Sequence, residues 1–88
     1  MQTIIARHKV GDINEWLKGH QDRVDLFAPV SSGFRTFQDT NDPASVVVII
    51  ETDNVEKLAA VINDPANATV KAKHTVLEPI TISVEIKP

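Results

Sequence analysis

The sequence predicts a single α+β domain in which the elements follow the order β-α-β-β-α-β, an arrangement called the ferredoxin-like sandwich. Four segments have strand character, and two have the 3.6-residue apolar period of a helix. No Gly/Ser-rich or repeated stretch divides residues 1–88 into separate domains. A chain of this size removes only about 60–65% of its unfolded surface from water. A second chain would therefore stabilise it considerably.

The first strand and the first helix are predicted before Pro29. Residues 3–10 alternate in polarity, and this alternation places His8 on the same face as the apolar Ile4, Ala6 and Val10. Asp12 then stands three residues before Glu15, which is the spacing of a capping box. A single helix is expected to follow, because one stripe of residues recurs at helical spacing. The stripe consists of Ile13, Trp16, Leu17, His20, Val24, Phe27 and Ala28.

The middle of the chain predicts a hairpin. Residues 34–39 form a short second strand, and the turn formers of residues 40–45 lead directly into a third strand at residues 46–52. Right-handed crossovers then place strands 1 and 3 at the centre of the sheet, in the spatial order 4-1-3-2. We therefore expect an antiparallel sheet with both helices on one face.

The last third of the chain predicts a second helix and a final strand. Asp53 repeats the capping spacing, and an apolar stripe follows between Val55 and Ile62. Asp64 and Pro65 are expected to restart a helical turn that runs to about His74. After Pro79 the sequence alternates with a period of two, which predicts a strand with one buried face. The apolar members of this strand are Ile80, Ile82, Val84 and Ile86.

The third strand predicts how the molecule assembles. Residues 46–50 are apolar on both faces, although two helices can cover only one face of the sheet. We expect a second copy of the same sheet to cover the other face and form a homodimer. Ile5 would line this interface together with one of two sets of strand-3 residues, according to the register. The two sets are Val47 with Ile49, and Val46 with Val48 and Ile50.

Composition argues against several classes of function. The chain has no cysteine, so thiolate chemistry, disulfides and Cys zinc sites are excluded, and the cytoplasm is the expected compartment. A net charge of -3 with scattered basic residues gives no stripe for nucleic acid. The apolar run of residues 46–50 is far shorter than the roughly 20 residues of a membrane helix. His8, His20 and His74 lack metal-ligand spacing, so neither a metal nor another cofactor is expected.

The chain resembles the dimeric α/β-barrel superfamily, which includes antibiotic-biosynthesis-monooxygenase-like proteins and related small uncharacterised proteins. The resemblance rests on Arg7-His8-Lys9-Val10 with Asp12 and Trp16, on Gly33-Phe34-Arg35, and on residues 46–51 followed by Asp53. It implies a dimer of ferredoxin-like domains. Members include cofactor-free oxygenases, haem-degrading enzymes, isomerases and proteins without known activity, so the resemblance specifies the fold more closely than the function.

Five residues are candidates for a pocket between the first helix and the sheet. His8 is the candidate catalytic base, and its alternative role is that of a satisfied core histidine. Trp16 and His20 lie one turn apart on the inner stripe of the helix, where they either bind a ligand or simply pack. Arg35 either forms an ordinary surface pair with Glu51 or holds a ligand carboxylate. Phe37 completes the predicted set.

Two hypotheses of function follow from these residues. The first is a homodimeric protein that binds a small, partly apolar metabolite, and that carries out cofactor-free oxygenase-like or cyclase/isomerase-like chemistry if it is an enzyme. The second is a non-catalytic dimeric structural or regulatory module whose crevice is filled by its own side chains. An open cavity beside His8 and His20 would favour the first hypothesis, and a closed one would favour the second.

Overall fold

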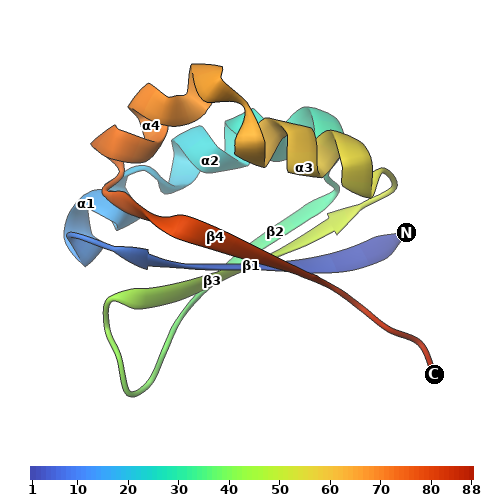
Figure 1. Ribbon diagram of the computed structural model, residues 1–88, viewed down its shortest axis with the longest axis horizontal. Coiled ribbons are helices and arrows are strands. Elements are labelled where there is room, and N and C mark those ends of the chain that lie inside the picture. The colour runs from blue at the N-terminus through green and yellow to red at the C-terminus, as the bar shows by residue number, and fades with distance from the viewer.

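The computed structural model describes all of Met1–Pro88 and contains one four-stranded sheet. Every helix lies on the same face of this sheet, and the other face is open (Figure 1). The strands are β1 (Gln2–Val10), β2 (Gly33–Gln38), β3 (Ser45–Thr52) and β4 (Val76–Val84). Their order is β2-β3-β1-β4, and all three pairings are antiparallel. The predicted ferredoxin-like fold and its order 4-1-3-2 are confirmed.

The prediction of one long first helix is wrong, because the helix breaks at Gly19. The two parts are α1 (Ile13–Lys18) and α2 (His20–Phe27), followed by the 3-10 turn η1 (Ala28–Val30). The Gly19 N–H donates to the Trp16 carbonyl, 3.1 Å away, and so closes α1. A Cβ atom at position 19 would lie 2.5 Å from ring atoms of His74. Gly19 therefore provides the space that the His74 ring occupies.

The start of α1 confirms one half of the predicted capping box. Asp12 Oδ1 accepts hydrogen bonds from the backbone N–H groups of Asn14 and Glu15, at 2.9 and 3.2 Å. The reciprocal half is wrong, because the Asp12 N–H donates instead to Thr75 Oγ1, 3.0 Å away. The Glu15 carboxylate pairs with Lys18. A hydroxyl from the loop before β4 thus replaces the predicted local contact.

The second half of the chain follows the predicted order of elements, but the predicted cap at Asp53 is wrong, because Asn54 caps the next helix by accepting from the Lys57 N–H at 3.0 Å. The start of β4 differs as well. The helices are α3 (Val55–Asn63), the 3-10 turn η2 (Pro65–Asn67) and α4 (Ala68–Lys73), and Asp64 caps η2 through the Ala66 N–H. β4 starts at Val76 rather than after Pro79, because an edge strand tolerates a proline. It ends at Val84, so Ile86 lies outside the strand and is 84% exposed.

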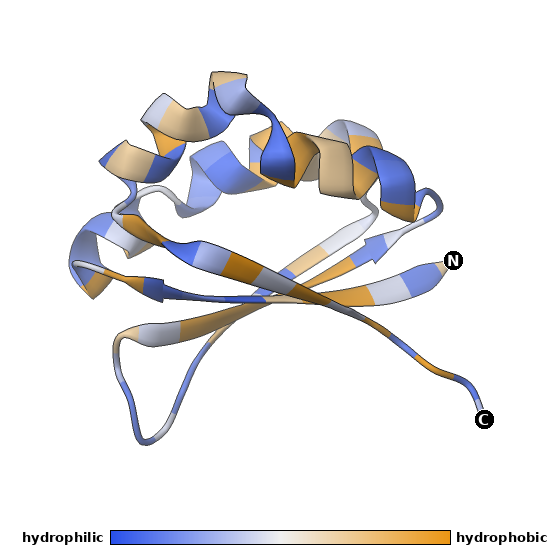
Figure 2. Ribbon diagram, in the orientation of Figure 1, coloured by the Kyte–Doolittle hydropathy of each residue, from blue (hydrophilic) through white to orange (hydrophobic).

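The two faces of the sheet bury different residues. On the helix-covered face, apolar side chains of β1 and β3 pack against α1 to α3 and form the core. Its most buried members are Ile4, Val46, Ile50, Trp16 and Leu58. The open face carries the alternate residues of the same strands, where Ile5 pairs with Ile49 and Phe37 pairs with Val47. Figure 2 shows apolar residues along the strands as well as on the helices. Of the two interface sets predicted, the register puts Val47 and Ile49 on the open face.

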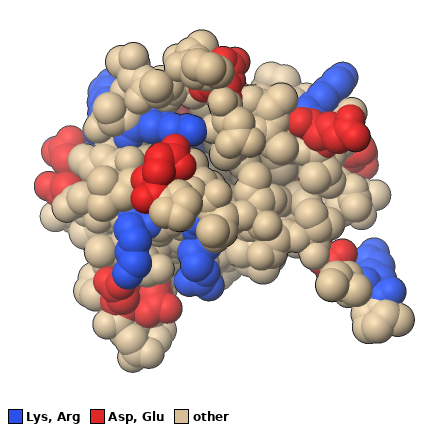
Figure 3. Space-filling view, viewed as in Figure 1, with Lys and Arg blue, Asp and Glu red and all other residues tan.

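Charged side chains of both signs are interspersed over the face of the molecule seen in Figure 3. Lys9 and Asp42 form an ion pair between β1 and the β2–β3 loop. No helix of the protein is long and apolar enough to cross a membrane.

Candidate functional site

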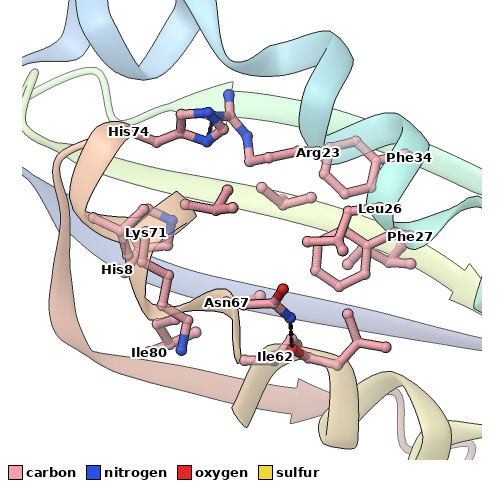
Figure 4. A pocket seen from close by; sticks show the side chains of 16 residues that line it. His8, Arg23, Leu26, Phe27, Phe34, Ile62, Asn67, Lys71, His74 and Ile80 are labelled. Atoms are coloured by element: carbon pink, nitrogen blue, oxygen red, sulfur yellow. Dashed lines mark hydrogen bonds between the residues drawn. The ribbon is translucent and has the colours of Figure 1, made fainter. Parts of the chain in front are cut away.

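A cavity of about 70 Å³ lies between the helical layer and the sheet. Most of its wall is apolar and comes from the strands and from α2, α3 and α4. Figure 4 shows Arg23 and His74 facing each other at one end and Asn67 near the other. The polar side chains that line it are those of His8, Arg23, Asn67, Lys71 and His74. A mostly dry chamber with a few converging polar groups is the usual form of a small-molecule site.

His8 reaches the cavity because the alternation of β1 turns it toward the helices. Its Nδ1 atom lies 2.9 Å from the Lys9 carbonyl oxygen. A carbonyl can only accept, so Nδ1 carries the proton and Nε2 keeps its lone pair. Burial lowers the pKa of His8 below its ordinary value of 6.5, and the nearby Arg23 charge adds to this effect. At neutral pH the ring is therefore an uncharged base.

Trp16 does not line the cavity but packs against two residues that do, His8 and Arg23. It is almost completely buried on the inner side of α1, and its ring stands edge-on to the His8 ring with the centroids 5.8 Å apart. The Arg23 guanidinium lies over the face of the same indole, 4.1 Å from the centroid. Trp16 thereby fixes the positions of both a base and a cation.

Arg23 is the most unusual residue of the site, because it is buried without a carboxylate partner. Its side chain belongs to α2 and the residue is only 6% exposed. Nη1 donates to His74 Nδ1 at 3.2 Å, whereas Nε and Nη2 have no hydrogen-bond partner. Burial lowers the pKa of Arg23 to about 10, so the guanidinium stays charged at neutral pH.

His74 orients Arg23 from the end of α4. An arginine N–H can only donate, so His74 Nδ1 accepts and its ring proton resides on Nε2. Nε2 lies 3.5 Å from the Asp22 carboxylate, which is longer than a normal hydrogen bond. Burial and the Arg23 charge lower the pKa of His74 below 6.5, so this ring is also neutral.

The structure does not bring the five predicted site residues into one pocket. Only His8 lines the cavity, and Trp16 lies behind it. The His20 ring lies outside, where it contacts Phe34 and places Nδ1 at 3.4 Å from the Thr36 hydroxyl.

Arg35 and Phe37 lie on the opposite face of the sheet from the cavity. Their register partners on β3 are Ile49 and Val47, which belong to the open face. The Arg35 guanidinium lies 5.8 Å from the centre of the Phe37 ring. The prediction of one shared pocket is wrong here because side chains alternate along β2, so that Thr36, between Arg35 and Phe37, is the residue that turns toward the helices.

Arg23 and His74 were missed as cavity residues. Arg23 stands seven residues after Trp16 and four before Phe27, so helical spacing already places it on the buried stripe. His74 has no comparable signal, because its burial depends on the gap beside Gly19.

The chemistry available to this site follows from its charges. His8 Nε2 can accept a proton from a ligand, and the Arg23 cation can stabilise negative charge in a low-dielectric cavity. No cluster of three or more His, Asp or Glu side chains that could hold a metal ion is present.

The one-sided helical layer and the cavity beneath it define a ferredoxin-like domain, and this is the fold of antibiotic biosynthesis monooxygenases. A crystal structure described as an antibiotic biosynthesis monooxygenase has a TM-score of 0.72 and 18% identity, covering 100% of this chain and 99% of that one. A conserved protein from Methanosarcina mazei Go1 has a TM-score of 0.70 and 11% identity, covering 99% and 92%.

SnoaB, a cofactor-independent oxygenase from Streptomyces nogalater, has the same fold. Its TM-score is 0.65 at 16% identity, and the match covers 99% of this chain and 92% of SnoaB. A comparison with protein-family models gave no match, and neither did a comparison with curated proteins. At these identities the likeness establishes the fold, and the function has to be argued from the site.

Proposed function

We propose that this protein is a homodimeric small-molecule enzyme with cofactor-independent, oxygenase-like or isomerase-like activity, and that His8 is its catalytic base. The observation that carries the proposal is the unprotonated Nε2 of a buried, neutral imidazole in an apolar cavity. The likeness to SnoaB, a cofactor-independent oxygenase, supports the same reading.

The proposed reaction starts with a proton transfer. His8 Nε2 removes a proton from an acidic C–H or O–H group of the ligand and becomes an imidazolium, while the ligand becomes an enolate or phenolate. An electron-rich carbanion or enolate of this kind can react with O₂ and take back the imidazolium proton to give a hydroperoxide. The hydroperoxide then loses water, so that a CH₂ group of the ligand becomes a carbonyl group, with one oxygen atom of O₂ in the product and the other in the water. If the proton returns to a different carbon, the result is an isomerisation.

A non-catalytic dimeric module is the second candidate. The observation that favours it is the size of the cavity, since about 70 Å³ is well below the roughly 300–1,000 Å³ of typical ligand sites. In this case His8 would only satisfy its own hydrogen bond and pack against Trp16.

The homodimer is proposed on the open face of the sheet. This face exposes Phe37 to 44% and Ile5 to 38%, next to the half-buried Val47 and Ile49. Contiguous apolar surface of this kind usually marks an interface. Ile49→Lys would place a charge in the centre of the contact and is expected to give a folded monomer in light scattering. Ala60→Lys, on the exposed side of α3, is the matched control and should stay dimeric.

Proton transfer is tested directly with a panel of small enolisable ketones and electron-rich phenols. In D₂O, NMR follows deuterium uptake at ligand carbons, and an oxygen electrode follows O₂ consumption. His8→Gln is expected to abolish both signals, whereas His20→Gln removes an imidazole outside the cavity and should leave them intact. Ligand binding without either signal would favour the non-catalytic module. Turnover that survives in His8→Gln would rule out His8 as the base.

A further inference from the structure

The Arg23 guanidinium holds two donors for which the protein provides no acceptor. Nε and Nη2 are both buried without a hydrogen-bond partner, and no Asp or Glu oxygen lies within ion-pair distance of them. Burying an unpaired charge is among the most expensive features that a small domain can contain. Such a group in the wall of a cavity indicates that an acceptor arrives from outside.

The chemistry of that acceptor follows from which donors are free. Nε–H and the adjacent Nη2–H point from the same edge of the guanidinium plane, and this pair forms two parallel hydrogen bonds to a planar carboxylate. The third nitrogen, Nη1, is already held by His74, and the plane is stacked on Trp16. The pair formed by Nε–H and Nη2–H, called the fork below, is therefore fixed in position before any ligand binds.

The remaining wall specifies the rest of the ligand. Leu26, Phe27 and Val61 belong to the apolar lining, and the charge of Lys71 is paired with the Glu78 carboxylate, 3.3 Å away. A volume of about 70 Å³ accommodates only a short apolar group. The cavity thus combines a cationic end with a small hydrophobic compartment.

We propose that Arg23 binds the carboxylate of a small carboxylic acid whose apolar part occupies the cavity. The proposal rests on the small-molecule site described above and names its ligand class. His74 acts as a positioning residue in this arrangement, since it contacts the guanidinium through Nδ1 and leaves the carboxylate-binding edge free.

Butyrate and butyramide are suitable probes, because they have almost the same shape and differ in charge. Both are titrated into the wild-type protein while NMR follows the side-chain Nε–H signal of Arg23. Butyrate is expected to shift this signal and to bind on the order of ten-fold more tightly or more. Equal affinity for the two would overturn the carboxylate subsite and leave the cavity proposal standing. Binding of neither would overturn both.

Two variants separate the fork from general electrostatics. Arg23→Met keeps an unbranched apolar stem without the charged guanidinium and is expected to remove the preference for butyrate. Lys73→Met removes one positive charge from the exposed side of α4 and should preserve that preference. Arg23→Lys keeps the charge without the fork, so it serves as a second test where Arg23→Met does not fold. A preference for butyrate that is undiminished in either Arg23 variant contradicts the proposal.

Discussion

The two faces of this sheet are built from the same strands and yet differ in what they bury. The helix-covered face holds the core, and buried polar residues, among them His8, Arg23 and His74, line the cavity on the same face. The open face has no covering layer and carries apolar side chains such as Ile5 and Phe37. Function on the first face is indicated by polar groups where apolar ones would be expected. On the second face it is indicated by apolar groups where polar ones would be expected.

Because successive side chains of a strand point to opposite faces of the sheet, one strand can contribute both to the core and to the open face. In β3, Ile50 packs under the helices, while Ile49 faces the opposite direction and packs against nothing but its sheet neighbours. The energetic consequences of changing each residue should differ accordingly. The cavity residues depend on the fold of one chain, whereas the proposed role of the open face requires a second chain.

The largest expected effect comes from truncating the two neighbouring isoleucines of β3. Ile50→Ala should lower the free energy of unfolding by about 2–5 kcal/mol, because it leaves a cavity in the core. Ile49→Ala should lower the free energy of unfolding by about 1 kcal/mol or less in the monomer. The loss should grow as the protein concentration rises and the proposed dimer forms. Urea unfolding at about 1 µM and about 100 µM measures both quantities. Equal, concentration-independent losses would show that the two faces are not different in this way.

The next effect concerns the space beside His74. Gly19→Ala should destabilise the protein by about 1–3 kcal/mol, because the added methyl group would overlap the buried imidazole. Gly11→Ala is the matched control, since a Cβ atom there would lie 3.5 Å from Thr75 in ordinary contact. Its effect should stay within about 0.5 kcal/mol. If the two variants unfold at the same urea concentration, the ring does not occupy the place described.

Acidification should weaken the helix-covered face specifically. The pKa values of His8 and His74 are lowered from 6.5, so the unfolded chain takes up protons first as the pH falls. The free energy of unfolding is therefore at its full value above about pH 7. Below about pH 6.5 it decreases by up to about 1.4 kcal/mol per pH unit for each histidine. Urea unfolding between about pH 7.5 and pH 5 measures the slope, which His8→Gln should reduce. An unchanged slope in that variant would contradict the lowered pKa.

The smallest effect is that of the cap of α1, which belongs to neither face. Asp12→Ala should lower stability by about 1 kcal/mol, because two helical N–H groups lose their acceptor. Asp12→Asn retains an acceptor oxygen and should remain close to the wild type. A denaturation midpoint that does not move in the alanine variant would mean that the cap contributes nothing to stability.

The fold could be predicted from the sequence because its signals are local and periodic. Alternation in β1, the continuous apolar run of β3, the turn between β2 and β3, and right-handed crossovers together specify the sheet order. The break at Gly19 could not be predicted, since it depends on a ring that arrives from His74, far along the chain. The early start of β4 was hidden by Pro79, which normally argues against a strand.

The site could be predicted only in part. Alternation places His8 on the covered face, and alternation along β2 places Arg35 and Phe37 on the opposite face. Arg23 was obscured because a charged residue on a helical stripe usually lies at its solvent edge. Its burial requires the Trp16 face, the His74 nitrogen and the gap at Gly19 at the same time. That combination exists only in three dimensions.

The tautomer and charge of His8 test the central claim most directly, and NMR of the ¹⁵N-labelled imidazole measures both at once. The structure predicts a proton on Nδ1, an unprotonated Nε2 at neutral pH and a titration midpoint below 6.5. A ring that carries its proton on Nε2, or that is charged at neutral pH, could not act as the proposed base. Either result would contradict the assignment of the cavity as a site of proton transfer.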